Sequence, residues 1–451
     1  MDVSGKRVVI IGAAKSGLAA AKALSEIGAK VLLSDLQDWG RLEKSIKEAN
    51  LPPEVELETG GHGEKALSAD FIILSPGVPP NIPILRKASE KGIPILSEIE
   101  IAYLLSRGRR FVITGSNGKT TTTTLLSEFC KGYFSRVFLG GNIGIPMMEF
   151  ALKTRDEDIQ VLEVSSFQLE TISKFCPDIG LITNFYENHL DRYPSYEAYR
   201  AAKERIALNM DSSKWLILNG EQPLMREFAK RTRAKIAWFG FGLNDRPCVT
   251  SINGNITFIS ENGEKTTLFS EKTVKILGRH NLENAMAASA AALISGIPAQ
   301  NLASVVSKFP GVEHRLEWVK ELHGVTYIND SKGTNCAASI TALKACKKPI
   351  ILIAGGRDKG TDLIEWKNMV SQFTRGVILY GEARERFRAS LEGLIPLKLA
   401  ASFADAVNMA AGWAIPGDTV LLSPACSSYD LFPNFEIRGT TFKELVNGLP
   451  E

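Results

Sequence analysis

Short apolar runs alternate along this chain with stretches in which apolar residues recur every three or four positions. In the first third, Arg7–Ile11, Lys30–Ser34 and Phe71–Leu74 are short and apolar, whereas Gly17–Ile27 is rich in alanine. The short runs predict buried strands, and the alanine-rich stretch predicts a helix. Strands that alternate with helices favour a parallel, doubly wound sheet. This part of the chain therefore predicts an α/β domain.

The same alternation begins again near Phe111 and once more near Glu313. Between these two α/β units, Cys248–Ser270 differs, because Asn253-Gly254 and Asn262-Gly263 interrupt a run of alternating residues. Asn-Gly pairs in this setting are typical of tight hairpins, so we expect a small antiparallel insert. The strands predicted for the two α/β units are Val137–Leu139, Gln160–Val164, Ile179–Thr183, Lys214–Leu218, Val325–Asn329, Ile350–Ala354, Gly376–Tyr380 and Thr419–Leu422.

Three domains are expected from the length of 451 residues, at about 100 to 200 residues per domain. Phe309-Pro310-Gly311 predicts a linker, since Pro and Gly interrupt regular structure. We place the domains at 1–98, 99–310 and 311–451. The first is expected to be Rossmann-like, the second to resemble a P-loop ATPase with the antiparallel insert, and the third to be a Rossmann-like α/β domain.

Charge and cysteine content restrict the class of protein. The net charge of +3 comes from 53 basic and 50 acidic residues, and this balance does not point to nucleic acid as a partner. We find no apolar run long enough to span a bilayer and no secretory signal. The six cysteines are dispersed, without a C-x-x-C pair. We therefore expect a cytoplasmic protein with free thiols and no zinc site. We also expect a monomer, although charge and cysteine content do not bear on the oligomeric state.

A glycine-rich turn follows the apolar run Phe111–Ile113 and reads Thr114-Gly115-Ser116-Asn117-Gly118-Lys119-Thr120-Thr121. Strand, glycine turn and Lys-Thr at a helix start are typical of a phosphate-binding loop, in which backbone N–H groups and the helix N-terminus face phosphate oxygens. Lys119 would reach the β- and γ-phosphates, and the Thr120 hydroxyl would hold Mg²⁺. The turn is shorter than G-x-x-x-x-G-K-[ST], because Ile113 occupies the first glycine position. A tight turn with an incidental lysine is the alternative.

A second glycine turn, Gly12-Ala13-Ala14-Lys15-Ser16-Gly17, joins the first strand to the first helix. It resembles G-x-G-x-x-G, but Ala14 replaces the glycine that lets a pyrophosphate approach the backbone. Asp35 ends the second strand, where an acid often contacts a ribose. The turn is compatible with a dinucleotide, with the uridine diphosphate part of a substrate, or with a purely structural role.

Polar residues follow several strands of the middle unit. Glu163 lies at the end of Gln160–Val164, where the carboxyl ends of parallel strands form a ligand crevice, and its oxygens would suit Mg²⁺. Gly140–Gly144 offers room for a substrate, and His189 and Asp191 follow the next strand. A structural histidine and a surface carboxylate are the alternatives. Lys203, in the helical stretch 196–208, would by itself be a surface lysine. Asn281 and Asn284, at the expected start of an alanine-rich helix, would be caps or nucleotide contacts.

Three polar clusters in the last unit also follow strands. They are Asp330–Asn335, Gly355–Gly360 and Ser423–Ser428. Because these strand ends meet at one edge of a sheet, the clusters define a single crevice. It contains the cations Lys359 and Arg438 and the hydroxyls of Thr334 and Ser428, which suits an anionic amino acid with an extra carboxylate.

With these motifs, the chain resembles the Mur ligase family over essentially its whole length, and within it the branch that adds D-glutamate. The family's phosphate loop is the short T-G-[ST]-N-G-K-[ST]-[ST]. The motifs that resemble this branch are Ser75-Pro76-Gly77, Gly140–Gly144, Leu162–Leu169, Asn329-Asp330-Ser331-Lys332 and Leu422–Cys426. The resemblance implies that ATP phosphorylates the L-alanyl carboxylate of UDP-N-acetylmuramoyl-L-alanine, and that the amine of D-glutamate attacks the resulting acyl phosphate.

The resemblance also implies a role for each site residue. Lys119, Glu163, His189 and Lys203 would be catalytic, and Thr120, Glu163, His189 and Lys203 would hold two Mg²⁺ ions, with Lys203 carbamylated on its amine. The expected ATP contacts are Gly115, Ser116, Asn117, Gly118, Lys119, Thr120, Thr121, Asn281, Asn284, Arg315 and Asp330. The expected UDP-substrate contacts are Lys15, Ser16, Asp35, Ser75, Gly77 and Asn142, and those of D-glutamate are Thr334, Lys359, Ser428 and Phe435.

Three other functions are compatible with parts of the sequence. A folylpoly-γ-glutamate synthetase would share the ATP-dependent ligase core, but Asn329–Lys332 and the first domain argue against it. A dinucleotide-dependent oxidoreductase would use Gly12–Gly17, but Ala14 and the second nucleotide loop argue against that. A nucleotide-gated binding protein without turnover is the third alternative, and Glu163, His189 and Lys203 together argue against it.

Overall fold

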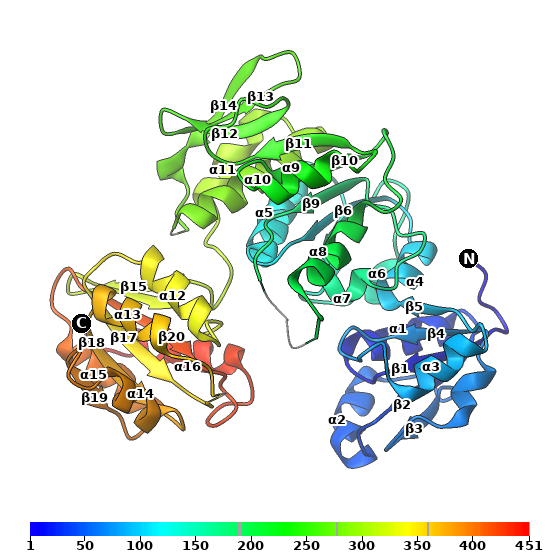
Figure 1. Cartoon of the computed structure of the whole chain (residues 1–451), viewed down its shortest axis with the longest axis horizontal. Coiled ribbons are helices and arrows are strands. Elements are labelled where there is room, and N and C mark those ends of the chain that lie inside the picture. The colour runs from blue at the N-terminus through cyan, green and yellow to red at the C-terminus, as the bar shows by residue number, and fades with distance from the viewer. Residues whose placement is uncertain (188–191, 277, 359, 451) are drawn as a thin grey trace. The chain divides into compact units, whose positions relative to one another are not determined.

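Three sheets, each flanked by helices, make up the chain (Figure 1). The computed structural model describes residues 1–187, 192–276, 278–358 and 360–450. By their internal contacts, the residues form two compact units, 1–271 with 283–305 and 272–282 with 306–451. The first unit contains the first two sheets and the second unit contains the third. The predicted α/β class with three sheets is thus confirmed, whereas the boundaries at 98/99 and 310/311 stay a prediction.

The N-terminal sheet is fully parallel, in the order β3-β2-β1-β4-β5. Its central strand β1 is aliphatic, and Val8–Ile11 are completely buried, as the apolar run predicts for a strand covered on both faces. The first helix begins at Lys15, two residues before its predicted start. The elements are β1 (Arg7–Ile11), α1 (Lys15–Glu26), β2 (Lys30–Asp35), α2 (Trp39–Ala49), β3 (Glu56–Thr59), η1 (Glu64–Ser68), β4 (Phe71–Leu74), α3 (Pro83–Glu90), β5 (Ile95–Ser97) and α4 (Glu98–Leu105).

The central sheet has the order β14-β13-β12-β11-β10-β9-β6-β8-β7. Its parallel part ends at β12, and the pairs β12–β13 and β13–β14 are antiparallel. At the β12–β13 turn, Asn253 and Gly254 have φ angles of 51° and 75°, the left-handed pair that a two-residue hairpin requires. The predicted insert is confirmed, as an extension of the central sheet. Its strands are β6 (Arg109–Thr114), β7 (Val137–Gly141), β8 (Ile159–Glu163), β9 (Ile179–Ile182), β10 (Trp215–Asn219), β11 (Lys235–Phe239), β12 (Cys248–Ile252), β13 (Asn255–Ile259) and β14 (Lys265–Ser270).

Helices of the central region follow most of its strands. The alanine-rich helix α10 begins at Arg279, before Asn281, so Asn281 and Asn284 lie inside its first turns and not at its cap. The described helices here are α5 (Lys119–Lys131), α6 (Met148–Ala151), α7 (Ser166–Leu169), α8 (Tyr196–Glu204), η2 (Arg205–Ala207), α9 (Pro223–Ala229), η3 (Glu271–Thr273), α10 (Arg279–Ser295), η4 (Ala299–Asn301) and α11 (Leu302–Lys308). The predicted linker Phe309–Gly311 lies between α11 and the third sheet, outside helices and strands.

The C-terminal sheet has the order β15-β16-β20-β17-β18-β19 and is parallel except for the pair β15–β16. Helices pack on it around two apolar clusters, one centred on Trp366 and one on Phe442. The elements are β15 (Glu317–Leu322), β16 (Val325–Asn329), α12 (Cys336–Ala345), β17 (Ile350–Gly355), α13 (Ile364–Phe373), β18 (Thr374–Tyr380), α14 (Arg384–Leu391), β19 (Leu397–Leu399), α15 (Phe403–Trp413), β20 (Thr419–Ala425) and α16 (Phe435–Asn447).

Helix α4 joins the N-terminal sheet to the central region through two buried glutamates. Glu100 accepts hydrogen bonds from the backbone N–H groups of 173, 174 and 175 at 2.7–3.0 Å. Glu98 accepts one from the N–H of Met148 at 2.8 Å, and burial raises its pKa to about 7. Buried carboxyl groups need such partners, so these bonds fix α4 against the central region.

Two expectations about the chain as a whole concern membranes and thiols. In the described part of the chain, no helix has both the length and the apolar character needed to cross a bilayer. All six cysteines are free, as predicted.

The first glycine turn depends on a close approach that only glycine permits. Gly12 has a φ of 102°, and a Cβ placed on Gly17 would lie 1.9 Å from the carbonyl oxygen of Gly12. Gly17→Ala should therefore lower the free energy of unfolding by about 2 kcal/mol or more, measured by urea denaturation. Gly40→Ala, in α2 of the same domain, is the control, because its new methyl group meets no atom within 4 Å. This control should leave stability unchanged or raise it by up to about 1 kcal/mol. Equal effects of the two substitutions would contradict the packing argument.

Candidate active site

Three strands of the central sheet end at the same level. Ile113 of β6 and Gly141 of β7 are both in register with Glu163 of β8. The segments that follow these strands, the phosphate loop and the Gly140–Gly144 turn, therefore meet Glu163 at one edge of the sheet. The register thus confirms that the sequence-predicted residues after β6, β7 and β8 gather in one place.

Glycine is required at two positions of the phosphate loop. Gly115 has a φ of 140° and Gly118, the N-cap of α5, a φ of 79°. A Cβ on Gly115 would lie 1.9 Å from Oγ1 of Thr183, and one on Gly118 would lie 2.2 Å from Oδ1 of Asn284. The loop is therefore packed tightly against its neighbours in a left-handed conformation that a side chain would disturb.

The segment after β9 holds the loop in place. Asn184 accepts a hydrogen bond from the N–H of Asn117 at 2.8 Å and donates one to its carbonyl at 3.1 Å. Thr183 donates to the same carbonyl at 2.6 Å, and the N–H of Ser116 bonds to the carbonyl of Asn184 at 3.0 Å. Thr183 and Asn184 were not among the predicted site residues, although they directly follow the buried parallel strand β9, a position that often carries site residues.

Glu163 lies beside the first turn of α5, in hydrogen-bond contact with Thr120. It is 2% exposed, and its Oε2 accepts a hydrogen bond from the Thr120 hydroxyl at 2.7 Å while Oε1 accepts one from Asn142 at 2.8 Å. Asn142, predicted to contact the UDP substrate, thus orients Glu163. Lys119 extends back over the loop, and its Nζ donates to the carbonyls of Gly115 and Ser116 at 3.0 Å each.

Lys203 is buried, contrary to what its helical position alone would suggest. It is 1% exposed, and its Nζ lies 4.5 Å from the centre of the Tyr199 ring, one helical turn earlier. Burial lowers the pKa of Lys203 well below its usual value, the charge of Lys119 lowers it further, and Glu163 opposes both effects. Tyr199 donates to the Ser116 hydroxyl at 3.2 Å. Tyr199 therefore connects Lys203 to the phosphate loop, a role that sequence analysis missed.

The structure describes some of the other predicted residues of the central site and not others. His189 and Asp191 lie outside the described residues. Asn284 accepts a hydrogen bond from Thr122 at 3.3 Å and lies next to Gly118, so it belongs to the phosphate-loop surroundings. Asn281 is buried but belongs to the second compact unit. Within the described ranges, no three His, Cys, Asp or Glu side chains gather as a metal cluster.

The N-terminal turn brings several predicted UDP contacts together. Asp35 accepts hydrogen bonds from the N–H groups of Ala13 at 2.6 Å and Gln37 at 2.8 Å. Ser75 is buried, and its hydroxyl donates to the carbonyl of Gly12 at 2.8 Å. Lys15 and Ser16 open α1 beside this turn, and Gly77 lies two residues after Ser75. The carboxylate of Asp35 therefore supports the turn itself.

The three polar clusters of the third sheet meet where β16, β17 and β20 end. The N–H of Ala425 donates to the carbonyl of Gly333 at 2.9 Å, and the N–H of Arg357 donates to the carbonyl of Ser427 at 2.9 Å. Asp330, 7% exposed, accepts a hydrogen bond from Ser423 at 2.8 Å. The structure thus brings the three predicted polar clusters together, while Lys359 lies outside the described residues.

The remaining D-glutamate candidates lie in or next to these clusters. Thr334 is half-buried and Ser428 is buried, within the clusters after β16 and β20. Phe435 begins α16, its carbonyl accepts a hydrogen bond from Ser331 at 2.8 Å, and Lys332 lies over its ring. Arg315, predicted to contact ATP, lies between His314 and Leu316, whose φ angles are 64° and 44°.

Arg438 corrects one prediction about this crevice. It was expected as a cation for the ligand, but it is completely buried. Its guanidinium donates to the carbonyls of Ser331 and Cys426 at 2.7–3.2 Å and to the Ser331 hydroxyl at 3.0 Å. Arg438 therefore holds two of the three clusters in place from inside the domain. The sequence could not show this, because Arg438 and Ser331 are 107 positions apart and only the fold brings them together.

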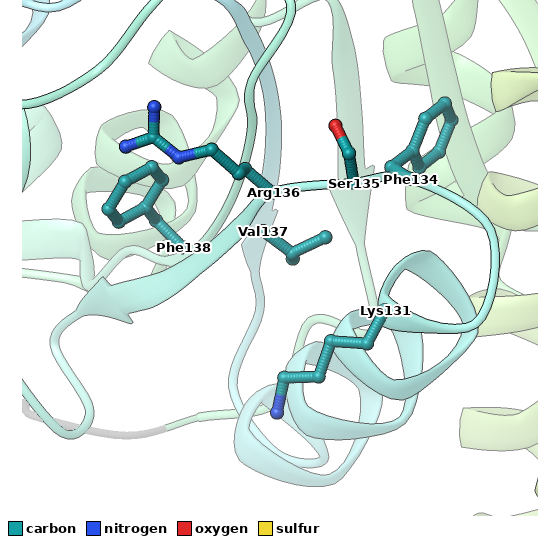
Figure 2. A pocket seen from close by; sticks show the side chains of 6 residues that line it. All are labelled: Lys131, Phe134, Ser135, Arg136, Val137 and Phe138. Carbon is teal, nitrogen blue, oxygen red and sulfur yellow. The ribbon is translucent and has the colours of Figure 1, made fainter.

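A pocket of about 410 Å³ lies away from these residues. It is lined by the C-terminal end of α5, the start of β7 and the segment that connects them (Figure 2), whereas the phosphate loop precedes the N-terminal end of α5. Arg136 there pairs with the buried Asp158 at 3.4 Å and lies over the ring of Phe138. These contacts are structural, and the pocket contains none of the predicted site residues. Its lining residues are Lys131, Phe134, Ser135, Arg136, Val137 and Phe138.

Family models match all three parts of the chain. Residues 6–97 match the Mur ligase MurD-like N-terminal domain, residues 113–292 the Mur ligase middle domain, and residues 314–426 the Mur ligase glutamate ligase domain. A protein of Alkaliphilus metalliredigens named UDP-N-acetylmuramoylalanine--D-glutamate ligase is 40% identical over 100% of this chain and 99% of that protein. The chain belongs to the Mur ligase family. A ligase of the same name from Acidobacterium capsulatum is 41% identical over 99% of this chain and 97% of its own length.

Solved structures support the Mur ligase fold. The UDP-N-acetylmuramate-alanine ligase of Thermotoga maritima aligns with a TM-score of 0.60 at 17% identity, over 98% of this chain and 99% of that one. A pseudomurein peptide ligase of Methanothermus fervidus aligns equally well, with a TM-score of 0.60 at 18% identity over the same shares. At such low identity the likeness concerns the fold alone.

Asp330 generates a prediction about pH. Burial raises its pKa to about 7, which the Ser423 hydrogen bond and the nearby arginines only partly offset. Between about pH 4 and 7 the folded protein therefore holds a proton that the unfolded chain has lost, so stability falls as pH rises through this window. Asp330→Asn should remove this slope and gain on the order of 3 kcal/mol over the wild type by pH 8, measured by urea unfolding at stepped pH.

Asp245→Asn is the control for this experiment. The hydrogen bonds from Arg226 lower the pKa of Asp245, so its ionised form stabilises the fold above the unfolded pKa, and this contribution is lost as pH falls. Replacing it should therefore produce a change of opposite sign. A slope that persists in Asp330→Asn would show that another group is responsible.

Proposed function

We propose that this chain joins D-glutamate to UDP-N-acetylmuramoyl-L-alanine in peptidoglycan precursor synthesis, with cleavage of ATP to ADP and phosphate. The observation that carries the proposal is identity of about 40% over the full length to ligases named for this reaction. The N-terminal domain supports the same branch, because its family model is specifically MurD-like.

The phosphate loop supplies the charge balance for phosphoryl transfer. A carboxylate is a poor acyl donor, and its oxygen attacks the γ-phosphorus of ATP, displacing ADP and giving an acyl phosphate. Catalysis of this step is mostly positioning and charge neutralisation. The backbone N–H groups from Gly115 to Thr121 and the ammonium of Lys119 would bind the transferred phosphoryl group. The tight packing of the loop keeps these donors in place before the substrate arrives.

The second step forms the amide bond. The amine of D-glutamate attacks the acyl carbon, a proton leaves the nitrogen, and the tetrahedral intermediate expels inorganic phosphate. Thr334, Lys359, Ser428 and Phe435 would bind D-glutamate in the crevice of the third sheet, where Arg438 holds the surrounding loops. Lys15, Ser16, Asp35, Ser75 and Gly77 would bind the UDP part of the acceptor, with Asn142 at the end nearer to Glu163.

The residues at the start of α5 fit a magnesium ion. The Thr120 hydroxyl and the Glu163 carboxylate lie 2.7 Å apart, and both offer the hard oxygen atoms that Mg²⁺ prefers. Asn142 fixes the orientation of Glu163 from the other side. When bound, the ion would neutralise charge on the phosphate oxygens. His189 and Lys203 would hold a second ion.

Carbamylation of Lys203 suits its surroundings. Carbon dioxide reacts with an uncharged amine, and burial favours that form of Lys203. The product is an anion, which the positive charge of Lys119 would favour, and it would offer oxygen atoms to a metal. The environment of Lys203 therefore supports the modification that the family resemblance implies.

The other functions considered from the sequence gain no support. An oxidoreductase would have to bind a dinucleotide at the first glycine turn, where Ala14 replaces the glycine that lets a pyrophosphate approach. A folylpoly-γ-glutamate synthetase would lack the MurD-like first domain that this chain has. We propose the cytoplasm as the compartment, because six free thiols suit a reducing environment. A monomeric state stays a prediction.

Phosphate release from ATP with Mg²⁺ and UDP-N-acetylmuramoyl-L-alanine tests the reaction. We expect release with D-glutamate and not with L-glutamate, meso-diaminopimelate or L-lysine, since stereochemistry decides whether the two carboxylates fit one crevice. Release with another of these amino acids would keep the ligase reaction but contradict the D-glutamate assignment. Release with none of them would contradict the proposed function.

Lys203 gives a separate prediction. In ¹³C-bicarbonate, the wild type should show a carbamate ¹³C signal that Lys203→Arg lacks, because the guanidinium stays charged and does not react. Lys203→Arg should also lose at least about a hundredfold in kcat, in keeping with the loss of a positioned catalytic group. Lys230, an exposed lysine of the same domain, is the control, and Lys230→Arg should keep both signal and activity. A wild-type protein without the signal would contradict the modification.

A further inference from the structure

Arg192 contacts three groups from two domains. Its Nη1 donates to the carbonyl of Pro76 at 3.0 Å, and its Nη2 donates to Oε2 of Glu170 at 3.1 Å. The guanidinium carbon lies 3.9 Å from the centre of the Phe167 ring. The side chain is 17% exposed and that of Glu170 is 18% exposed, so water screens these contacts only partly. A planar guanidinium can make all three contacts at once, which a lysine cannot.

Glu170 and its neighbours form a firm base for Arg192 in the central domain. Tyr193 donates a hydrogen bond to the other oxygen of Glu170, so two consecutive residues bind one carboxylate. Phe167 stacks on Tyr193 with ring centres 5.8 Å apart. Both Phe167 and Glu170 belong to the short helix α7 or its C-cap, and a capping box of Ser165 and Gln168 fixes the start of this helix.

Pro76 lies in the turn Ser75–Gly77, which follows β4 of the N-terminal sheet. Ser75 ties one side of this turn to the carbonyl of Gly12, and Arg192 ties the other side to the central domain. The turn is therefore held from both domains. Its two flanking residues are among those assigned above to the UDP part of the substrate.

We propose that Arg192 is a positioning residue for the UDP-sugar substrate. It holds the Ser75–Gly77 turn against the central domain, so that the UDP subsite has a fixed geometry relative to the phosphate loop. The inference rests on the proposed function for the role of Ser75 and Gly77. Without the guanidinium, the turn loses its anchor to the central domain and keeps only the Ser75–Gly12 hydrogen bond, so substrate binding has to restrain its position relative to the central domain.

Arg226 provides a matched control in the central domain. It also contacts a backbone carbonyl, a carboxylate and an aromatic ring: its Nε donates to Gly220 at 2.8 Å, and its two terminal nitrogens donate to Asp245 at 2.9 Å. Its guanidinium lies 5.0 Å from the Trp238 ring centre. All of these partners belong to the central domain and none is a predicted substrate contact.

The test compares Arg192→Gln, Arg192→Lys and Arg226→Gln by steady-state kinetics and by calorimetric titration with UDP-N-acetylmuramoyl-L-alanine without ATP. Arg192→Gln should raise both the KM and the Kd for this substrate about tenfold, as loss of a hydrogen bond from a charged donor does. The KM values for ATP and D-glutamate should change less than twofold. Arg192→Lys should raise the same two constants, and Arg226→Gln should leave all of them unchanged while lowering the Tm.

Each outcome decides a separate question. An unchanged Kd for the UDP substrate in both Arg192 variants, or an equal rise of all three KM values, would overturn the positioning role. If Arg192→Gln does not fold, Arg192→Lys and Glu170→Gln decide by the same Kd. A wild-type protein that neither binds nor turns over UDP-N-acetylmuramoyl-L-alanine would instead overturn the proposed function, and with it the assignment of the turn.

Discussion

The pairing of Glu163 with Thr120 is the interaction on which the central site depends. It exists because β6, β7 and β8 end in register, so that the phosphate loop, the Asn142 turn and Glu163 meet at one sheet edge. A carboxylate that is 2% exposed is costly unless donors surround it, and Thr120 and Asn142 supply them. The same oxygens that stabilise the free protein are the ones suited to a divalent cation.

The pKa of Lys203 depends on its burial and on two charged neighbours. Burial and the charge of Lys119 both lower this pKa, and Glu163 raises it, with burial the largest effect. Tyr199 covers Lys203 with its ring and bonds to Ser116 of the loop, so one aromatic side chain connects the amine to the phosphate site. A neutral amine can react with carbon dioxide to give an anionic carbamate. A fully exposed lysine would instead remain a cation.

Hydrogen bonds from charged side chains connect the N-terminal sheet and α4 to the central region within the first compact unit. Glu98 and Glu100 of α4 bind backbone N–H groups of the central region, and Arg192 reaches the carbonyl of Pro76. In each contact a charged side chain binds a backbone atom of another segment. The position of that segment is therefore fixed whatever side chain it carries there. In the third domain, Arg438 does the same for the loops after β16 and β20.

The sequence by itself determined the α/β class, the antiparallel insert, the phosphate loop and most strands in the interior of each sheet, because apolar runs and glycine turns are local signals. It did not predict β3, β5, β11, β15 and β19, four of which lie at a sheet edge. It also predicted Glu163 as a site residue from its place at a strand end. Only the tertiary structure decided that Arg438 is buried, that Lys203 is shielded by Tyr199, and that Arg192 joins two domains. The contacts of Arg438 and Arg192 join residues 107 and 116 positions apart, and no local pattern encodes which distant groups will surround a charge. Tyr199 and Lys203 are only one helical turn apart, but their spacing does not show that the fold buries both of them.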